Sequence, residues 1–341
     1  MLWAMRKIVI PRPGPPSVLE IREFPDPTAA AGEVRIRVRA CGINFADLMA
    51  RMGMYPDAPK MPCTVGYEAA GVIDQVGDGV TTLAVGDRVF AMPHFGGQAD
   101  TLVLPAEQVF RMPAAMDFPE AGGLPVVYLT AHHCLLYTGH LRPGATILIH
   151  SIAGGVGLAA IELARMRGCT ILGTASPGKH DFLRARGVQH PLPNDCDLEK
   201  EVRAIVGDKG LDLVLDPVGG RSWVTGYKLL GPAGRLVCYG YSSMTGGTKR
   251  NIFRVLKRIS ELSWWNPVTL MNDNKEISGV NMERFFRRLD IVRPQFESLI
   301  QLYEEGKIKP YVDRTFKFEE AAEAHQYLHD RKAKGKVVLV P

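Results

Sequence analysis

The sequence has few cysteines, and they are widely spaced. None forms a CxxC pair, which argues against a disulfide framework and against a thiolate zinc site. The six residues are Cys41, Cys63, Cys134, Cys169, Cys196 and Cys238. We therefore expect reduced thiols that are mostly buried.

Long apolar runs are also missing. No stretch of about 18 uninterrupted apolar residues occurs, so the sequence predicts no transmembrane helix. The segment from Met1 to Pro16 carries charges and lacks the apolar core of a signal peptide. Both absences favour a cytoplasmic protein.

Neither charge sign is in large excess. With 41 basic and 36 acidic residues spread along the chain, the net charge of +5 is too balanced to indicate a nucleic-acid partner. It does suit a small anionic ligand. A length of 341 residues with 46% hydrophobic composition can fill more than one core, so we expect two domains.

Two patterns follow each other along the chain. From Arg6 to about Gly122, glycine and proline interrupt short apolar runs such as Val34 to Val38 and Val72 to Val76, as in a mostly β domain. From Ala145, apolar strands alternate with helical stretches, which indicates βαβ units and a parallel sheet. The strands expected there are Thr146 to His150, Thr170 to Thr174, Leu211 to Leu215 and Arg235 to Gly240, and a last strand is expected at Val337 to Val340.

A glycine-rich turn joins the first of these strands to the helical run Leu158 to Met166. Glycines let the backbone approach a pyrophosphate, and the N–H groups and dipole of the following helix favour its charge. Gly154 and Gly157 fill two positions of a GxGxxG motif, but Ile152 fills the first. The alternative is a mere tight connection, but the strand–turn–helix context favours cofactor binding by Ala153, Gly154, Gly155, Val156 and Gly157.

The second strand indicates which nicotinamide cofactor is bound. A site for NAD usually places Asp or Glu there to bind the ribose 2′-hydroxyl, and none is present. Thr174, Ser176 and Lys179 instead offer hydrogen bonds and positive charge for a 2′-phosphate, so we predict NADP(H). The alternative for Lys179 is a solvated charge at a helix start.

Further candidate cofactor contacts follow the other strands of the sheet. Asp216 and Val218 come after the third strand and Gly240 and Ser242 after the fourth, at the carboxyl edge where open α/β sheets bind ligands. We include Asn194 among these contacts.

Several motifs resemble, in family order, the quinone oxidoreductase (zeta-crystallin) branch of the medium-chain dehydrogenases/reductases. They are Cys41 to Arg51 with Tyr55, Gly66-Tyr67-Glu68-Ala69-Ala70-Gly71, Gly86-Asp87-Arg88-Val89 and Ala153 to Gly157. Within that branch the chain looks most like homologues of the synaptic vesicle amine-transport protein. The signatures are Gly173 to Ser176 with Lys179-His180, Thr248 to Asn251, Trp264-Trp265-Asn266 and the ending Gly335 to Pro341.

The resemblance implies an α/β architecture with two domains and, usually, a homodimer. A GroES-like, mostly β catalytic domain would contain residues 1–124, completed by 308–341. A Rossmann doubly wound domain would contain residues 125–307, with an insertion at about 244–293. The family positions near the substrate are Asn44, Tyr55 and Tyr67, and Thr130 matches a position near the nicotinamide ring.

Zinc is not expected, because the resemblance places Asn44 and Tyr67 where alcohol dehydrogenases have cysteine and histidine ligands. An amide and a phenol replace a thiolate and an imidazole poorly at a tetrahedral zinc. Without a Lewis acid, substrates that spread the incoming charge are favoured, namely quinones and α,β-unsaturated carbonyls. Asn44 and Tyr55 could hydrogen-bond the carbonyl oxygen, and Tyr55 could relay a proton.

Structural alternatives remain for these side chains. Asn44 could cap a helix with Asp47, Tyr55 could pack on Pro56, Tyr67 could fill the space that zinc vacates, and Thr130 could bond the preceding turn.

A second hypothesis is a nucleotide-regulated protein that binds lipid or membranes and has little turnover. Lys249, Arg250, Arg254, Lys257 and Arg258, followed by Trp264-Trp265, could form a basic helix with an aromatic anchor. We favour a helix packed on its own domain over a membrane contact, since Ile252, Val255, Leu256, Ile259 and Leu262 follow helical spacing.

Overall fold

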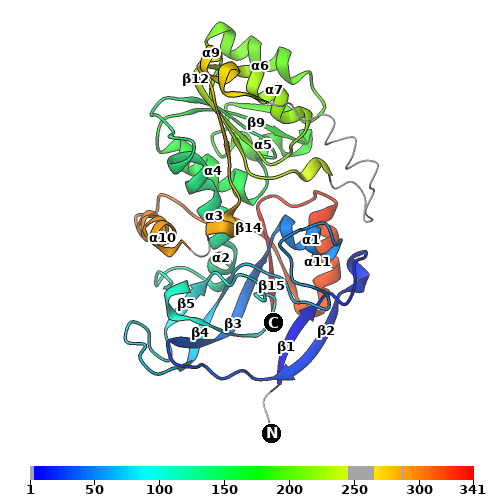
Figure 1. Ribbon diagram of the computed structural model, residues 1–341, viewed down its shortest axis with the longest axis vertical. Coiled ribbons are helices and arrows are strands. Elements are labelled where there is room, and N and C mark those ends of the chain that lie inside the picture. Colours follow the sequence, from blue (N-terminus) through cyan, green and yellow to red (C-terminus); the bar gives the residue numbers. More distant parts are fainter. Residues whose placement is uncertain (1–3, 245–264, 286–287) are drawn as a thin grey trace. The chain divides into compact units, whose positions relative to one another are not determined.

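The computed structural model describes residues 4–244, 265–285 and 288–341, and these divide into two units (Figure 1). Among the described residues, the first unit contains 4–129 and 283–341, and the second contains 130–244 and 265–282. The expected basic helix, with Lys249, Arg250, Arg254, Lys257, Arg258 and Trp264, lies outside the described residues.

A seven-stranded sheet forms the centre of the first unit, with the order β14-β15-β3-β4-β5-β7 and β6 paired to β3. Its strands are β3 (Glu33–Ile43), β4 (Ala69–Val76), β5 (Arg88–Ala91), β6 (Thr101–Pro105), β7 (Val109–Arg111), β14 (Val312–Lys317) and β15 (Lys336–Val340). A separate hairpin pairs β1 (Ala4–Val9) with β2 (Glu20–Pro25). All pairings in this unit are antiparallel except that of β14 with β15.

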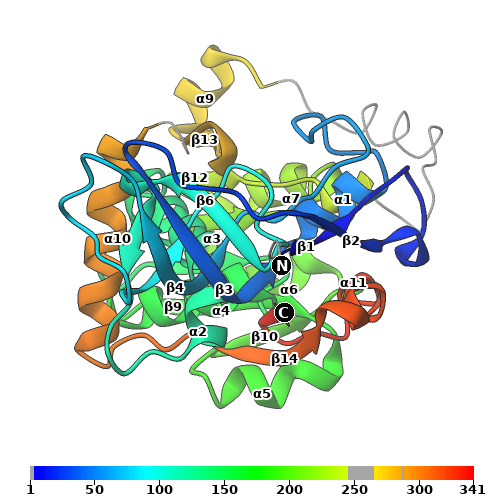
Figure 2. The same cartoon turned by 90° about the horizontal axis from the view of Figure 1, so that it is seen from below.

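Alternation of side chains explains the central strand β3, which lies beside β4 in both ribbon views (Figure 1, Figure 2). Val34, Ile36 and Val38 are buried, as expected for the apolar face of a half-buried strand. On the other face Arg35 and Arg37 both bind the Asp74 carboxylate, at 2.8 and 2.6 Å. One sequence pattern thus builds both the core and an ion network on the surface.

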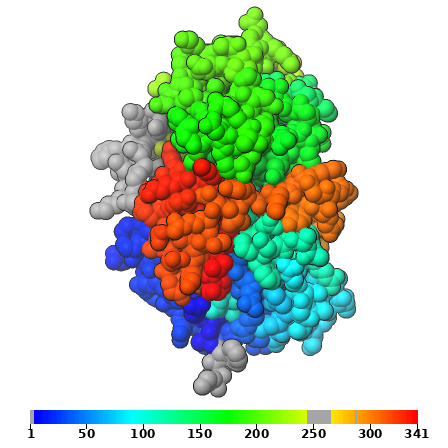
Figure 3. All heavy atoms as spheres, turned by 180° about the vertical axis from the view of Figure 1, so that it is seen from behind, coloured from blue at the N-terminus to red at the C-terminus, as the bar shows by residue number. Residues whose placement is uncertain are grey.

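The two segments of the first unit are interleaved. Strand β15 is hydrogen-bonded to both β14 and β3, so the end of the chain completes a sheet begun near its start. The space-filling view shows the red C-terminal residues next to blue N-terminal ones (Figure 3). The helices of this unit are α1 (Phe45–Arg51), α2 (Phe118–Gly123), α10 (Leu289–Glu304) and α11 (Ala321–His329), and α3 spans Pro125–His132.

Helix α10 falls in the first unit, whereas the sequence interpretation placed residues up to 307 with the second. Aromatic packing is the physical reason. The fully buried Phe296 of α10 lies 5.5 Å from Phe90 and 4.6 Å from Phe110, measured between ring centroids. The Tyr303 hydroxyl also donates a hydrogen bond of 2.7 Å to Glu120.

The second unit contains a six-stranded parallel sheet with the order β10-β9-β8-β11-β12-β13. In chain order this is 3-2-1-4-5-6, the doubly wound arrangement that binds dinucleotides. The strands are β8 (Thr146–Ile149), β9 (Thr170–Ala175), β10 (His190–Pro193), β11 (Leu211–Asp216), β12 (Leu230–Cys238) and β13 (Glu276–Gly279). The helices are α4 (Gly155–Arg165), α5 (His180–Arg184), α6 (Leu198–Val206), α7 (Arg221–Leu229) and α9 (Pro267–Asp273).

Candidate functional site

Asn44 lies at the start of α1, where β3 ends. Its backbone N–H donates a 2.7 Å hydrogen bond to the Asp47 side chain, so the predicted capping interaction is made by Asp47. The Asn44 amide has other partners: Nδ2 donates to Glu68 Oε1 at 2.8 Å, and Oδ1 accepts from Lys336 Nζ at 2.6 Å. An amide nitrogen carries two hydrogens, so Asn44 keeps one N–H for a ligand.

Glu68 and Lys336 form a buried ion pair beside Asn44. Glu68 is fully buried and Lys336 is 4% exposed. The other carboxylate oxygen of Glu68 accepts the Val126 backbone N–H at 2.8 Å. Because removing two charges from water is costly, such a pair persists only where further hydrogen bonds satisfy its atoms, as they do here.

Glycines make room for this pair. A methyl group on Gly42 of β3 would overlap both Glu68 and Lys336. A methyl group on Gly123 of α2 would lie 2.8 Å from Lys336 Cγ. The backbone around the pair is therefore shaped to hold a charged side chain from the last strand.

Asp47 is a second buried carboxylate in the same region. It is fully buried and accepts the Gly66 backbone N–H at 3.0 Å in addition to that of Asn44. Burial raises the pKa of Asp47 to about 7, although the Asn44 N–H and the Lys336 charge oppose this shift. Asp47 thus fixes the turn that carries Tyr67 into place.

Tyr55 and Tyr67 face each other with an edge-to-face geometry and a centroid distance of 6.2 Å. Tyr67 is 4% exposed, and its ring lies 5.2 Å from Phe95. Burial raises the pKa of both phenols well above the ordinary value, so both stay protonated hydrogen-bond donors at neutral pH. Asn44, Tyr55 and Tyr67 therefore belong to one polar cluster with Asp47 and Glu68.

This set of donors does not fit zinc. The Asn44 amide is bound by a carboxylate and an ammonium group, and a buried phenol with a raised pKa is a poor source of an anionic ligand. Across the described ranges, we find no group of three His, Cys, Asp or Glu side chains arranged for a metal ion.

In the second unit, the glycine-rich turn leads from β8 into α4, as predicted. Gly154 is the N-cap of α4, and no side chain caps the helix. A methyl group on Gly154 would meet only the Ser151 carbonyl oxygen, at 3.3 Å, whereas one on Gly157 would overlap the Ile152 backbone. Gly157 is thus required by the fold, whereas Gly154 is less crowded and lies at the end of a helix that favours anions.

Ile152 explains why the first position of the motif can lack glycine. Its side chain is fully buried and occupies the space over Gly173 of β9, where a methyl group would overlap it. The missing glycine is therefore compensated by another on the neighbouring strand. Pyrophosphate binding by this turn stays a prediction of the motif.

The end of β9 contains Thr174, Ser176 and Lys179. Thr174 is 6% exposed, and its hydroxyl contacts the Ser151 N–H at 3.3 Å and His150 Nδ1 at 3.2 Å. Ser176 is exposed, and Lys179 is half-buried at the end of a short 3₁₀ turn. The next carboxylate along the chain, Asp181, forms an ion pair with Arg184 at 2.9 Å.

Asp216 holds its own loop rather than pointing away from it. Its Oδ1 accepts the N–H groups of Val218 and Gly219 at 2.6 and 3.1 Å, and Oδ2 accepts the Ser222 hydroxyl. The Val218 N–H is therefore already used within the loop. His150 Nε2 lies 3.8 Å from Asp216 Oδ2, a contact at the centre of the sheet that the sequence reasoning missed.

The remaining candidates are spread along the same sheet edge and nearby. Gly240 packs on Pro217, and the Ser242 N–H donates to the Pro217 carbonyl at 2.9 Å, which ties two loops together. Asn194 is exposed in the turn after β10, and the buried Thr130 lies in α3.

The predicted residues thus fall into two groups. Asn44, Tyr55 and Tyr67 come together in the first unit, whereas the dinucleotide candidates follow β8, β9, β10, β11 and β12 in the second. The sequence analysis did not predict that Glu68 and Lys336 bind the side chain of Asn44. Glu68 directly follows Tyr67, and Lys336 is the only charge in an otherwise apolar strand, which were the available signals.

Comparison with known proteins identifies the family. Residues 30–114 match the alcohol dehydrogenase GroES-like domain, and residues 187–339 match the zinc-binding dehydrogenase family. The synaptic vesicle membrane protein VAT-1 homolog of Rattus norvegicus is 40% identical over 330 residues, covering 95% of this chain and 80% of that protein. The chain is a medium-chain dehydrogenase/reductase of the VAT-1 family.

Solved structures of this superfamily share the whole fold of this protein. The Escherichia coli quinone oxidoreductase, complexed with NADPH, is 27% identical with a TM-score of 0.86, covering 98% of this chain and 100% of that one. The CurK enoyl reductase is 28% identical with a TM-score of 0.86, covering 98% and 99%. The fold is that of a nicotinamide-dependent dehydrogenase.

Among the residues of this protein that the structure describes, no helix has the length and apolar character needed to cross a membrane.

The two glycines of the turn give a first prediction. We expect Gly154→Ala to lower the unfolding free energy by no more than about 1 kcal/mol, because its backbone is extended and its Cβ would crowd the Ser151 carbonyl oxygen only slightly, at 3.3 Å. The same methyl group would obstruct a pyrophosphate, so nucleotide binding is expected to weaken at least about tenfold. Urea unfolding and fluorescence titration with NADPH measure the two effects. Equal affinity in Gly154→Ala and the parent would contradict the assignment of this turn.

Proposed function

We propose that this protein is a zinc-independent, NADPH-dependent reductase of quinones or α,β-unsaturated carbonyls. The observation that carries the proposal is the pairing of Asn44 with Glu68 and Lys336, next to Tyr67, at the family's zinc-ligand positions. This cluster offers hydrogen-bond donors and no metal ligand set. It suits acceptors that delocalise the negative charge arriving with a hydride.

The choice of NADPH is supported by the end of β9. No carboxylate stands at the strand end for a ribose 2′-hydroxyl, and the next one along the chain, Asp181, lies in α5. Thr174, Ser176 and Lys179 supply hydroxyl groups and a positive charge for a 2′-phosphate. The NADPH complex of the related quinone oxidoreductase supports the same choice.

The residues of the first unit would stabilise the reacting carbonyl. When bound, the cofactor supplies the hydride. The remaining Asn44 N–H and the Tyr55 hydroxyl can donate hydrogen bonds to the substrate oxygen as charge develops on it. Lys336 and Glu68 hold the Asn44 amide in one orientation, so its free N–H is pre-organised for that task.

The test follows NADPH and NADH oxidation with a panel of ortho-quinones, para-quinones and enones. We expect turnover that prefers NADPH. Lys179→Ala should weaken NADPH binding by about tenfold to a hundredfold and leave NADH unchanged, because one charge-assisted hydrogen bond is lost. The matched control is Lys209→Ala, an exposed lysine of the same unit. Absence of NADPH binding by the parent would refute the proposal.

A second candidate function is a nucleotide-regulated protein that binds membranes with little turnover. It is supported by the name of the relatives, synaptic vesicle membrane proteins. Tight NADPH binding without turnover on any acceptor, together with salt-sensitive pelleting on anionic liposomes, would favour it over the reductase. We retain a cytoplasmic location as part of the first proposal, which the six free cysteines support.

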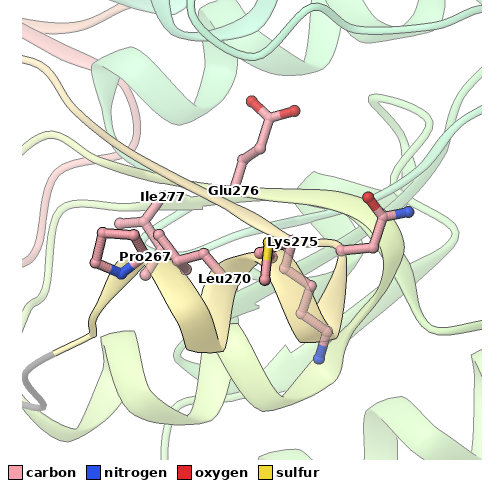
Figure 4. Close-up of a pocket in the computed structure, with 7 residues that line it drawn as sticks. Pro267, Leu270, Lys275, Glu276 and Ile277 are labelled. Atoms are coloured by element: carbon pink, nitrogen blue, oxygen red, sulfur yellow. The ribbon is translucent and has the colours of Figure 1, made fainter.

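We further propose a homodimer in which β13 takes part. Within the described part of the chain β13 pairs on one side only, with β12. Next to it, α9 exposes Val268 and Met271, and Pro267, Leu270, Lys275, Glu276 and Ile277 line a cavity of about 420 Å³ (Figure 4). Sedimentation equilibrium tests the stoichiometry, and Met271→Lys is expected to shift it towards the monomer.

A further inference from the structure

A buried histidine lies at the carboxyl end of β8, directly before the glycine-rich turn. His150 is 5% exposed, and its backbone N–H donates to the Leu215 carbonyl of β11 at 3.0 Å, which continues the pairing of these two strands. The strands on either side of β8 are β9, which carries Thr174, and β11, which carries Asp216. His150 therefore stands between two of the predicted dinucleotide-binding residues.

On the β9 side, the imidazole contacts Thr174. His150 Nδ1 lies 3.2 Å from Thr174 Oγ1, and the same oxygen accepts the backbone N–H of Ser151 at 3.3 Å. The Thr174 carbonyl also accepts the Ile152 N–H at 3.1 Å. The first two residues of the turn are thus both attached to Thr174, and the Thr174 side chain is attached to His150.

Ser151 has a backbone conformation that needs such support. Its φ is 54°, in the left-handed region that residues other than glycine rarely adopt. Strain of this kind persists only where the surrounding structure holds it, and the bond to Thr174 is one of the contacts that do so. The Ser151 carbonyl accepts the Gly154 N–H at 2.9 Å, and Gly154 is the N-cap of α4. The position of Ser151 therefore affects how the chain enters α4.

On the β11 side, the imidazole faces Asp216. His150 Nε2 lies 3.8 Å from Asp216 Oδ2, which is too long for a hydrogen bond but close enough for the charge to act on the ring. Nε2 is buried and, among the residues that the structure describes, has no hydrogen-bond partner. Asp216 in turn holds the loop after β11 through Val218, Gly219 and Ser222. The ring therefore lies between this loop and the glycine-rich turn.

The Asp216 charge favours one tautomer of His150. A lone pair on Nε2 would face the negative carboxylate oxygen, whereas an Nε2–H presents a positive hydrogen to it. With the proton on Nε2, Nδ1 is an acceptor, and the Thr174 hydroxyl donates to it while accepting from Ser151. The donors then all point in one direction, from the glycine-rich turn through Thr174 and His150 towards Asp216.

We propose that His150 is a positioning residue for the cofactor, which fixes Thr174 and, through it, the glycine-rich turn that receives the dinucleotide pyrophosphate. This rests on the NADPH binding proposed above. The His150 ring is too buried to be a ligand contact itself, so it acts through Thr174 and Ser151. A turn that is already fixed loses less conformational freedom when the ligand binds, which increases affinity.

The first test replaces the imidazole with a ring that cannot form hydrogen bonds. We expect His150→Phe to raise the Kd for NADPH about tenfold, because the bond to Thr174 is lost and the turn must be ordered on binding. The kcat at saturating NADPH should stay within about twofold, since the residues proposed to bind the reacting carbonyl belong to the first unit. Fluorescence titration measures the Kd, and NADPH oxidation with a quinone measures kcat.

Asparagine and glutamine separate the two sides of the ring. The Asn amide takes about the place of Nδ1 and can bind Thr174, whereas the Gln amide takes about the place of Nε2, next to Asp216. We expect His150→Asn to bind NADPH within about threefold of the parent and His150→Gln to resemble His150→Phe. In a Thr174→Val background, His150→Phe should lose most of its effect on the Kd.

The control for general loss of stability is Ile171→Val in the core of β9. Ile171 is fully buried, so this variant should lower the unfolding free energy but leave the Kd for NADPH unchanged. Urea unfolding is measured for every variant. If His150→Phe fails to fold, as judged by circular dichroism, the comparison of His150→Asn with His150→Gln decides the question.

The outcomes distinguish this role from a structural one and from failure of the cofactor assignment. Lower stability with an unchanged Kd in His150→Phe and His150→Gln would overturn the positioning role and leave NADPH binding standing. Equal Kd values for His150→Asn and His150→Gln would also overturn it, because the contact with Thr174 would then not matter. A parent that does not bind NADPH would overturn the proposed reductase function and the positioning role with it.

Discussion

Replacing Lys336 with methionine is expected to lower the unfolding free energy by about 3 to 5 kcal/mol. The change leaves the fully buried Glu68 carboxylate without its positive partner and removes a 2.6 Å hydrogen bond to Asn44. Methionine fills a similar volume, so the loss reports the unpaired charge rather than a cavity. Urea unfolding at neutral pH measures it.

Two control variants distinguish charge burial from general damage. Lys307→Met removes an exposed lysine that pairs with Glu305, and its effect should be far smaller. Adding Glu68→Gln to Lys336→Met should recover part of the lost stability, because the uncompensated charge disappears. If the double variant is less stable than the sum of the two single effects predicts, the buried pair does not act as described.

Acid should destabilise the fold through His325. This histidine is fully buried, 3.3 Å from the Arg51 guanidinium, and burial together with the Arg51 charge lowers its pKa from 6.5 to about 3. Below pH 6.5 the unfolded chain binds a proton here that the folded chain does not. His325 therefore does not change the unfolding free energy above pH 6.5. Between pH 6.5 and about pH 3, each unit by which the pH falls lowers the unfolding free energy by about 1.4 kcal/mol.

Asp47 acts in the opposite direction, so the parent alone does not reveal this slope. Its pKa is raised to about 7, and its contribution to stability falls as pH rises from 3.8 to about 7. The quantity to measure is the difference in unfolding free energy between the parent and His325→Gln from about pH 4 to about pH 8. Below pH 6.5 this difference should change by about 1.4 kcal/mol for each pH unit. The corresponding difference between the parent and His140→Asn should not change with pH. A flat curve for His325→Gln would show that acid does not act through this residue.

Much of the second unit can be predicted from the sequence because its strands are buried on both faces. Ile147 to Ile149 and Val214 to Leu215 are fully buried, and continuous apolar runs of this kind are easily recognised. The strands β10 and β13 have the sequences HPLP and EISG, and neither carries such a run. They form because a sheet edge is available to pair with, which is information that no local pattern contains.

The first unit shows where sequence patterns reach their limit. The motif around Asn44 and Tyr67 identified one side of the cluster, but Lys336 follows Asn44 by 292 residues. Only the sheet pairing of β15 with β3 brings Lys336 to Asn44. The sequence analysis placed helix α10 in the second domain. An amphipathic pattern shows that Phe296 is buried, but it does not show that Phe296 packs in the core of the first unit.

The place of β15 in the sheet has a consequence for synthesis of the protein. Residues 130–282 contain every described strand of the parallel sheet, so this unit can complete its pairing while the chain is still being made. The other unit leaves the ribosome early with the edge of β3 uncovered and Glu68 without Lys336. It stays unfinished until β15 is released, so the second unit is expected to mature before the first.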